Sequence, residues 1–100
     1  MATGYQLEFM PEALKEWAKL DKSIQKEFKN VLRRRLATPR VQSARLSGKL
    51  HNCFKIKSKK SGMRLIYTVV ENKHAVVVLA VGARDELIVY NKAQKRILKS

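Results

Sequence analysis

The sequence predicts an α+β domain whose elements follow the order β-α-α-β-β-β-α. An alternating apolar segment near the N-terminus is followed by two amphipathic helical patterns, and then by three apolar runs separated by short turns. Short turns join antiparallel neighbours, so we expect a mostly antiparallel sheet with an N-terminal helical hairpin and a C-terminal helix. A chain of 100 residues with 45% hydrophobic side chains predicts a single domain, residues 1–100.

Two different periodicities of apolar residues predict the first strand and the first helix. Residues 5–9 (YQLEF) alternate apolar and polar side chains, which is typical of a half-buried strand. Pro11 suits the first turn of a helix, because a proline there loses no hydrogen bond. Leu14, Trp17 and Leu20 follow at a spacing of three and predict one apolar stripe, with Trp17 as a core anchor.

A second helix is predicted between Asp21, a candidate N-cap, and the Thr38–Pro39 pair, which ends it. The link between the two helices is very short, so they form a helical hairpin. One face of the second helix is apolar: Ile24, Phe28, Val31, Leu32 and Leu36.

Three strands follow a connector at residues 40–52. The third run is almost entirely apolar, which predicts a central strand that is covered on both faces. The strands are residues 53–58, 63–70 and 75–81, with turns at residues 59–62 and 71–74.

The C-terminal stretch allows two interpretations. A helix beginning near Asp85 would place Leu87, Tyr90, Ala93 and Ile97 on one face. Alternatively, residues 87–90 are extended and Asn91 caps a helix that begins after it. We favour the second interpretation.

The net charge of +14 predicts a polyanionic partner. Between Glu27 and Glu71 there is no acidic residue, and the basic residues there are Lys29, Arg33, Arg34, Arg35, Arg40, Arg45, Lys49, Lys55, Lys57, Lys59, Lys60 and Arg64. A segment without compensating acids repels itself, which favours a binding surface over a merely solvated one.

Several classes of protein are disfavoured. No run approaches the ~20 apolar residues of a membrane span, and no N-terminal signal is evident. The single cysteine, Cys53, excludes an internal disulfide and a cysteine-based zinc site. We therefore expect a cytoplasmic protein with no membrane association, no metal and no cofactor.

A cationic sheet face is predicted where the strands at 53–58 and 63–70 pair. Lys55 and Lys57 point to the same face, and Arg64 lies on the neighbouring strand. Arg84 and Tyr90 follow the third strand and complete a cleft with an aromatic ring. Cations that bind phosphate beside a stacking ring are typical of single-stranded RNA recognition. Lysines that protect a strand edge from aggregation are the alternative interpretation.

A resemblance to a known family is carried by the segments 13–17 (ALKEW), 46–48 (LSG), 53–57 (CFKIK), 61–67 (SGMRLIY) and 81–84 (VGAR), with Tyr90. With these segments the chain resembles the RelE group of ribosome-dependent mRNA interferases, the toxins of bacterial toxin–antitoxin pairs. The resemblance implies a compact fold like that of microbial ribonucleases. It also implies cleavage of mRNA in the ribosomal A site, where the 2′-hydroxyl of the mRNA attacks the adjacent phosphate.

The resemblance also implies roles for five residues. Lys57 would be the general base, helped by Lys55, and Arg64 would stabilise the phosphorane-like charge. Arg84 would bind the phosphate and assist departure of the 5′-oxygen, while Tyr90 would stack on a nucleotide. Neighbouring cations disfavour the protonated form of a lysine, so a cationic cluster can provide a base.

Two positions depart from the family pattern. Ala83 stands where members often have a lysine, and Glu86 stands where many are basic. Both departures reduce the positive charge expected near Arg84.

Most of the charge is expected to bind the ribosome. The candidate phosphate-binding residues are Arg33, Arg34, Arg35, Arg40, Arg45, Lys49, Lys59 and Lys60. The expected partners are the ribosome, its A-site mRNA and an acidic, RelB-like antitoxin that joins a monomeric toxin in a hetero-oligomer. A ParE-like gyrase inhibitor and a non-catalytic nucleic-acid-binding module of the same fold stay open as alternatives.

Overall fold

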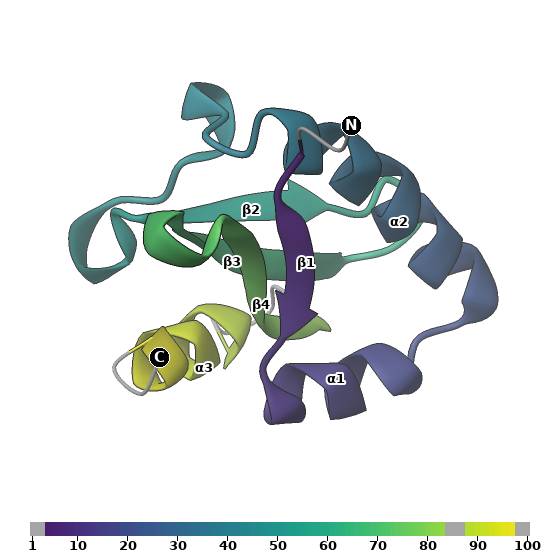
Figure 1. Ribbon diagram of the computed structural model, residues 1–100. Helices are drawn as coiled ribbons and strands as arrows, with labels where there is room; N and C mark the ends of the chain where they lie inside the picture. The colour runs from purple at the N-terminus through teal and green to yellow at the C-terminus, as the bar shows by residue number, and fades with distance from the viewer. Residues whose placement is uncertain (1–3, 84–87, 98–100) are drawn as a thin grey trace.

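The computed structural model describes residues 4–83 and 88–97 and contains a four-stranded mixed sheet in the order β1-β4-β3-β2 (Figure 1). β1 (Gln6–Phe9) runs parallel to β4 (Ala75–Ala83). β2 (Cys53–Lys57), β3 (Met63–Val70) and β4 form an antiparallel meander. The α+β class, the element order and the central position of β4 are therefore confirmed.

Three helices cover the sheet. α1 (Pro11–Ala18) and α2 (Lys22–Ala37) pack their buried side chains against one face, and α3 (Ile88–Ile97) packs against the other. Figure 1 shows α3 and α2 on opposite sides of the strands. α2 ends at Ala37, just before Thr38 and Pro39, as the sequence predicts. None of the described helices is long and apolar enough to cross a membrane.

The predicted apolar stripe of α1 is wrong at Leu14, which is 52% exposed. Ala13 is fully buried in its place, and Trp17 packs beside it against Phe28, with ring centroids 6.2 Å apart. Residues four apart lie on one helix face, so α1 is rotated until Ala13 and Trp17 face the sheet. The small alanine lets α1 lie close to the strands, where the Met10 N–H donates to the Val78 carbonyl at 3.0 Å.

The preferred interpretation of the C-terminal stretch is also wrong, because residues 88–90 are helical. Val89 and Ala93 are both fully buried against the sheet, in a cluster with Ile66 and Leu79. Burial of two side chains at helical spacing outweighs the capping signal of Asn91. A start near Asp85 lies outside the described residues.

The strand boundaries shift slightly at the two ends that matter for the site. β2 stops at Lys57, and Ser58 turns inward and is buried at the start of the loop to β3. β4 continues two residues beyond the predicted end, to Ala83. The end of β2 and the end of β4 pair with the beginning of β3 from opposite sides. Arg64 therefore lies between the start of the loop at 58–62 and the end of β4.

Candidate active site

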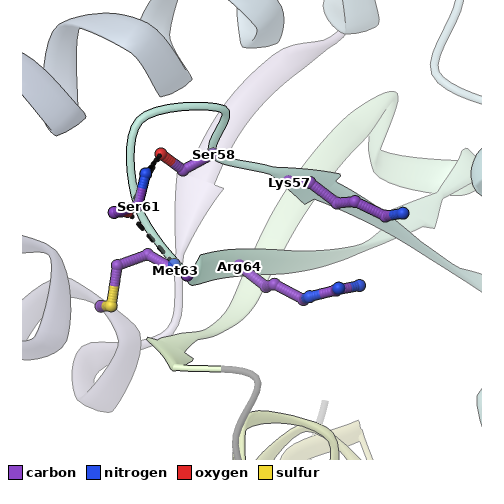
Figure 2. Close-up of a pocket in the computed structure, with 6 residues that line it drawn as sticks. Lys57, Ser58, Ser61, Met63 and Arg64 are labelled. Atoms are coloured by element: carbon purple, nitrogen blue, oxygen red, sulfur yellow. Dashed lines mark hydrogen bonds between the residues drawn. The ribbon is translucent and has the colours of Figure 1, made fainter.

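The centre of the site is a cross-strand pair of cations. In the β2–β3 register Lys57 lies directly opposite Arg64, and Lys55 lies opposite Ile66. Side chains alternate along a strand, so Lys55, Lys57 and Arg64 share one sheet face. Figure 2 shows the Lys57 and Arg64 side chains extending in the same direction. Like charges directly opposite each other destabilise a sheet, so this pair does not serve stability.

Tyr90 joins this pair from helix α3. The Arg64 guanidinium donates from Nη1 to the Tyr90 hydroxyl oxygen at 2.9 Å. Arg64, Tyr90 and Lys55 are half-buried, whereas Lys57 is exposed. The structure thus brings four predicted catalytic residues to one face, and Arg84 lies outside the described residues.

A hollow of about 360 Å³ opens beside the cationic pair (Figure 2). Its lining residues are Lys57, Ser58, Ser61, Gly62, Met63 and Arg64. The hollow is open to solvent and has one cation from each strand at its wall. Such an arrangement can hold a phosphate and stabilise added negative charge on it.

The described residues near this site provide neither a reactive thiol nor a cluster of metal ligands. Burial raises the pKa of the Cys53 thiol to about 11, so that thiol stays protonated and unreactive at neutral pH. Within residues 4–83 and 88–97, no three His, Cys, Asp or Glu side chains gather where they could hold a metal ion. The described residues that line the hollow offer the cations Lys57 and Arg64 and the hydroxyl groups of Ser58 and Ser61.

The arginines of α2 that were predicted together to bind RNA have different surroundings. Arg33 and Arg34 are exposed, and each donates to Asn30, at 3.0 Å and 3.4 Å. Arg35 instead is half-buried and donates to the Tyr67 hydroxyl at 2.9 Å and the Lys55 carbonyl at 3.3 Å. Its guanidinium is engaged in holding α2 against β2 and β3.

The connector arginines also have protein partners. Arg40 forms an exposed ion pair with Glu71 at 3.2 Å, and the Arg45 guanidinium donates to the His51 carbonyl at 2.7 Å. Lys49, Lys59 and Lys60 are exposed. These three lysines are therefore more available to a phosphate than Arg40 is.

A second hollow, of about 330 Å³, lies on the α2 side of Lys57. It is lined by Lys26, Glu27, Asn30, Val31, Arg34, Lys57, Lys59 and Lys60. Lys57 therefore borders both hollows. Cations that were predicted separately, from a helix and from a turn, meet around it.

Sequence reasoning missed Glu27, Ser58 and Ser61. The Ser58 hydroxyl donates to Glu27 at 2.6 Å, and the Lys59 N–H donates to the other oxygen of the same carboxylate at 2.5 Å. These two bonds hold the pKa of Glu27 below its usual range. The only signal was that Glu27 is the last acid before the acid-free segment, and that pattern does not reveal contacts 31 residues away.

Comparison with known proteins decides the family. Residues 7–88 match the family described as ParE toxin of type II toxin-antitoxin system, parDE. The sequence is 43% identical over 95 residues to the mRNA interferase toxin RelE of Escherichia coli K12, across 95% of this chain and 99% of the relative. The chain belongs to the RelE/ParE toxin family.

Solved structures of RelE proteins agree with this assignment. A free E. coli RelE variant with two arginines changed to alanine has a TM-score of 0.88 at 40% identity, over 95% of this chain and 99% of the variant. The toxin in the intact E. coli RelBE toxin–antitoxin complex has a TM-score of 0.77 at 39% identity, over 82% and 99% of the two chains. The resemblance to RelE and the expected RelE fold are thus confirmed.

Proposed function

We propose that this RelE-family chain is a ribosome-dependent endoribonuclease that cuts mRNA in the ribosomal A site. The observation that carries the proposal is the Lys57–Arg64 cross-strand pair, with Arg64 bonded to Tyr90 on a shared face. Two cations and an aromatic ring around an open hollow suit a phosphate and its adjoining base. The E. coli relative with 43% identity is named an mRNA interferase toxin.

The proposed reaction is an internal transfer of the phosphate. The 2′-oxygen attacks the adjacent phosphorus and loses its proton to Lys57, the proposed general base, while the bond from phosphorus to the 5′-oxygen breaks. Arg64 stabilises the negative charge that develops on the phosphate oxygens. The products are a 2′,3′-cyclic phosphate and a 5′-oxygen that takes up a proton to become a hydroxyl. Assistance to the departing 5′-oxygen by Arg84 stays a prediction.

We expect the reaction to need a ribosome, because the site itself provides few groups that could enclose or orient the mRNA. The hollow is open, and the described residues that line it include no carboxylate. A site that neither encloses nor orients its substrate gains most from a partner that holds the mRNA in a reactive geometry. The exposed cations of α2 and the 58–62 loop would bind ribosomal RNA phosphates beside it.

An acidic antitoxin and a cytoplasmic location complete the proposal. A net charge of +14 favours an acidic partner. The E. coli and Mycobacterium tuberculosis RelE relatives have both been solved in complexes with their antitoxins. We infer a RelB-like antitoxin that binds the monomeric toxin in the reducing cytoplasm.

Toeprinting on translating ribosomes tests the function. We expect new mRNA ends within the A-site codon when the protein is added, and far slower cleavage of the same RNA without ribosomes. Intact mRNA would refute the proposal. Intact mRNA together with accumulated gyrase–DNA cleavage complexes would instead favour the ParE-like alternative.

A further inference from the structure

Glu27, on helix α2, binds the loop that connects the two cationic strands. One carboxylate oxygen accepts from the Ser58 hydroxyl at 2.6 Å, and the other accepts from the Lys59 N–H at 2.5 Å. Ser58 directly follows Lys57, the last residue of β2. The carboxylate therefore anchors the point at which the chain leaves the proposed catalytic strand.

The hydrogen bonds continue from Ser58 across the loop to β3. The Ser58 hydroxyl oxygen accepts from the N–H groups of Lys60 and Ser61, at 3.2 Å and 3.1 Å, and lies 3.0 Å from the Ser61 hydroxyl. The Ser61 hydroxyl oxygen accepts from the Met63 N–H at 3.2 Å, and Met63 directly precedes Arg64. Figure 2 shows the part of this series that lines the hollow. A continuous set of bonds thus runs from Glu27 to the residue before Arg64.

We propose that Glu27 is the positioning residue of the Lys57–Arg64 pair, which it aligns through Ser58 and Ser61. The inference rests on the proposed function, in which those two cations act on the phosphate. In this role Glu27 acts through the loop and not on the phosphate or the attacking oxygen. It fixes the loop at 58–62, which joins the two strands at their cationic ends.

The charge of Glu27 supports positioning over RNA binding. Glu27 lines the hollow that Lys26, Arg34, Lys57, Lys59 and Lys60 also line, so its carboxylate weakens the attraction of that hollow for RNA. Both of its oxygens are engaged with the loop. A carboxylate at this place weakens RNA binding. Its role is therefore explained by the geometry of the loop that it holds.

Small displacements of this loop are expected to be costly for the reaction. A misplacement of about 1 Å can lower the rate of an oriented reaction by about 100-fold. Lys57 and Arg64 come from separate strands, so their relative position depends on the pairing of those strands and on the loop between them.

Glu27→Gln is the direct test, since glutamine keeps the size but replaces one acceptor oxygen with an NH2 group. We expect single-turnover cleavage of ribosome-bound mRNA to slow by about tenfold. Affinity for the ribosome should be unchanged or tighter, because a negative charge has been removed from a basic hollow. The Lys59 amide proton should move upfield in NMR spectra when its carboxylate partner is lost.

Two matched variants complete the test. Asp21→Asn removes one negative charge from the N-cap of the same helix, where Asp21 is exposed and makes no side-chain capping bond. Its cleavage rate should equal that of the unmodified protein. Ser58→Ala should slow cleavage like Glu27→Gln, and the double variant should be no slower than the worse single variant, because both act through one set of bonds.

Two outcomes would overturn the inference. One is a Glu27→Gln protein that cleaves at the unmodified rate while Arg64→Ala loses activity. The other is equal slowing by Glu27→Gln and Asp21→Asn, which would assign the effect to net charge. Unimpaired cleavage by Arg64→Ala itself would instead overturn the proposed function, so the two failures are distinguishable.

Discussion

Two sets of side-chain hydrogen bonds connect helix α3 to the rest of the protein, and they differ in whether a carboxylate accepts from the cations. Near its C-terminal end, Arg96 and Lys92 both donate to Glu16 of α1, at 2.8–3.0 Å and 2.9 Å. Near its N-terminal end, Tyr90 accepts one bond from Arg64 at 2.9 Å. The first place pairs its cations with a carboxylate, whereas the second gives its cation a neutral hydroxyl.

This difference distinguishes the residues that stabilise the fold from the residues of the candidate active site. Glu16 also accepts from the Val81 N–H at 3.0 Å, and Arg96 donates to the Leu79 carbonyl at 2.9 Å, so these groups are committed to each other. The partner that the described residues give Arg64 is a hydroxyl, which does not neutralise the guanidinium charge and leaves it available to a phosphate. At these two places, the cations bonded to Glu16 hold α3 to α1, and the cation bonded to Tyr90 belongs to the proposed RNA-binding site.

Replacing Lys57 with alanine should produce the largest effect on activity. Removal of a general base lowers a rate by about 100- to 10,000-fold. We expect a loss of at least about 100-fold in single-turnover cleavage of ribosome-bound mRNA. The melting temperature should not fall, because Lys57 is exposed and lies opposite another cation. An unchanged rate and an unchanged pH–rate profile would remove Lys57 from the role of base.

Replacing Glu16 with glutamine should instead lower stability. The Arg96 and Lys92 donors and the Val81 N–H together lower the pKa of Glu16 to about 2, against the opposing effect of partial burial. Since water screens a partly exposed pair, we expect a loss of about 1–2 kcal/mol in the free energy of unfolding at pH 7. Urea denaturation of both proteins provides the measurement.

The pH dependence of that difference has a defined sign. A carboxyl group whose pKa is lower in the folded state stabilises the protein above its unfolded pKa, near 4.5, and loses this contribution as pH falls toward the folded pKa, about 2. The stability gap between the native protein and Glu16→Gln should therefore close between about pH 5 and pH 2. A gap that stays constant across this range would show that the Glu16 charge does not hold α3.

Arg35 and Arg34 should separate stability from RNA binding within one helix. Arg35→Ala removes bonds to Tyr67 and to the Lys55 carbonyl, so we expect a loss of about 1 kcal/mol in unfolding free energy. Arg34→Ala should leave stability unchanged but reduce by about one the slope of log affinity for ribosomes against log salt. Equal effects of the two variants on stability would contradict the distinction.

Tyr90→Phe should give the smallest effect of the series. Phenylalanine keeps a ring for stacking and loses only the hydroxyl that Arg64 contacts. One hydrogen bond contributes about 1 kcal/mol, so we expect about fivefold slower cleavage. Tyr90→Ala should lose more, because a base stacked on an aromatic ring contributes about 1–3 kcal/mol. Equal losses in the two variants would assign the role of Tyr90 to its hydroxyl alone.

The features that could be predicted from the sequence are those that depend on local hydrophobic pattern and on the pairing of neighbouring strands. Alternation along β2 placed Lys55 and Lys57 on one face, and the short turn placed Arg64 on the neighbouring strand, where it lies opposite Lys57. Periodicity failed at Leu14, because an alanine one residue earlier lets α1 approach the strands more closely. Capping chemistry failed at Asn91, because burial of Val89 and Ala93 against the sheet favours a helix that already includes residues 88–90.

The parts that could not be predicted are contacts between residues far apart in the sequence. Glu27 meets Ser58 across 31 positions, and Glu16 meets Arg96 across 80. A run of three arginines likewise gives no sign that Arg35 turns inward while Arg33 and Arg34 stay exposed. Each of these outcomes depends on how α2 and α3 pack on the sheet, which no local pattern encodes.

Toeprinting with two forms of one message tests the central claim most directly. One form is entirely RNA, and the other carries a single 2′-deoxynucleotide at the cut position in the A-site codon. We predict that the unmodified protein cuts the first form in the A site and leaves the second intact, because the attacking 2′-oxygen is missing. Equal cutting of both forms, or no A-site cut in the first, would contradict this account.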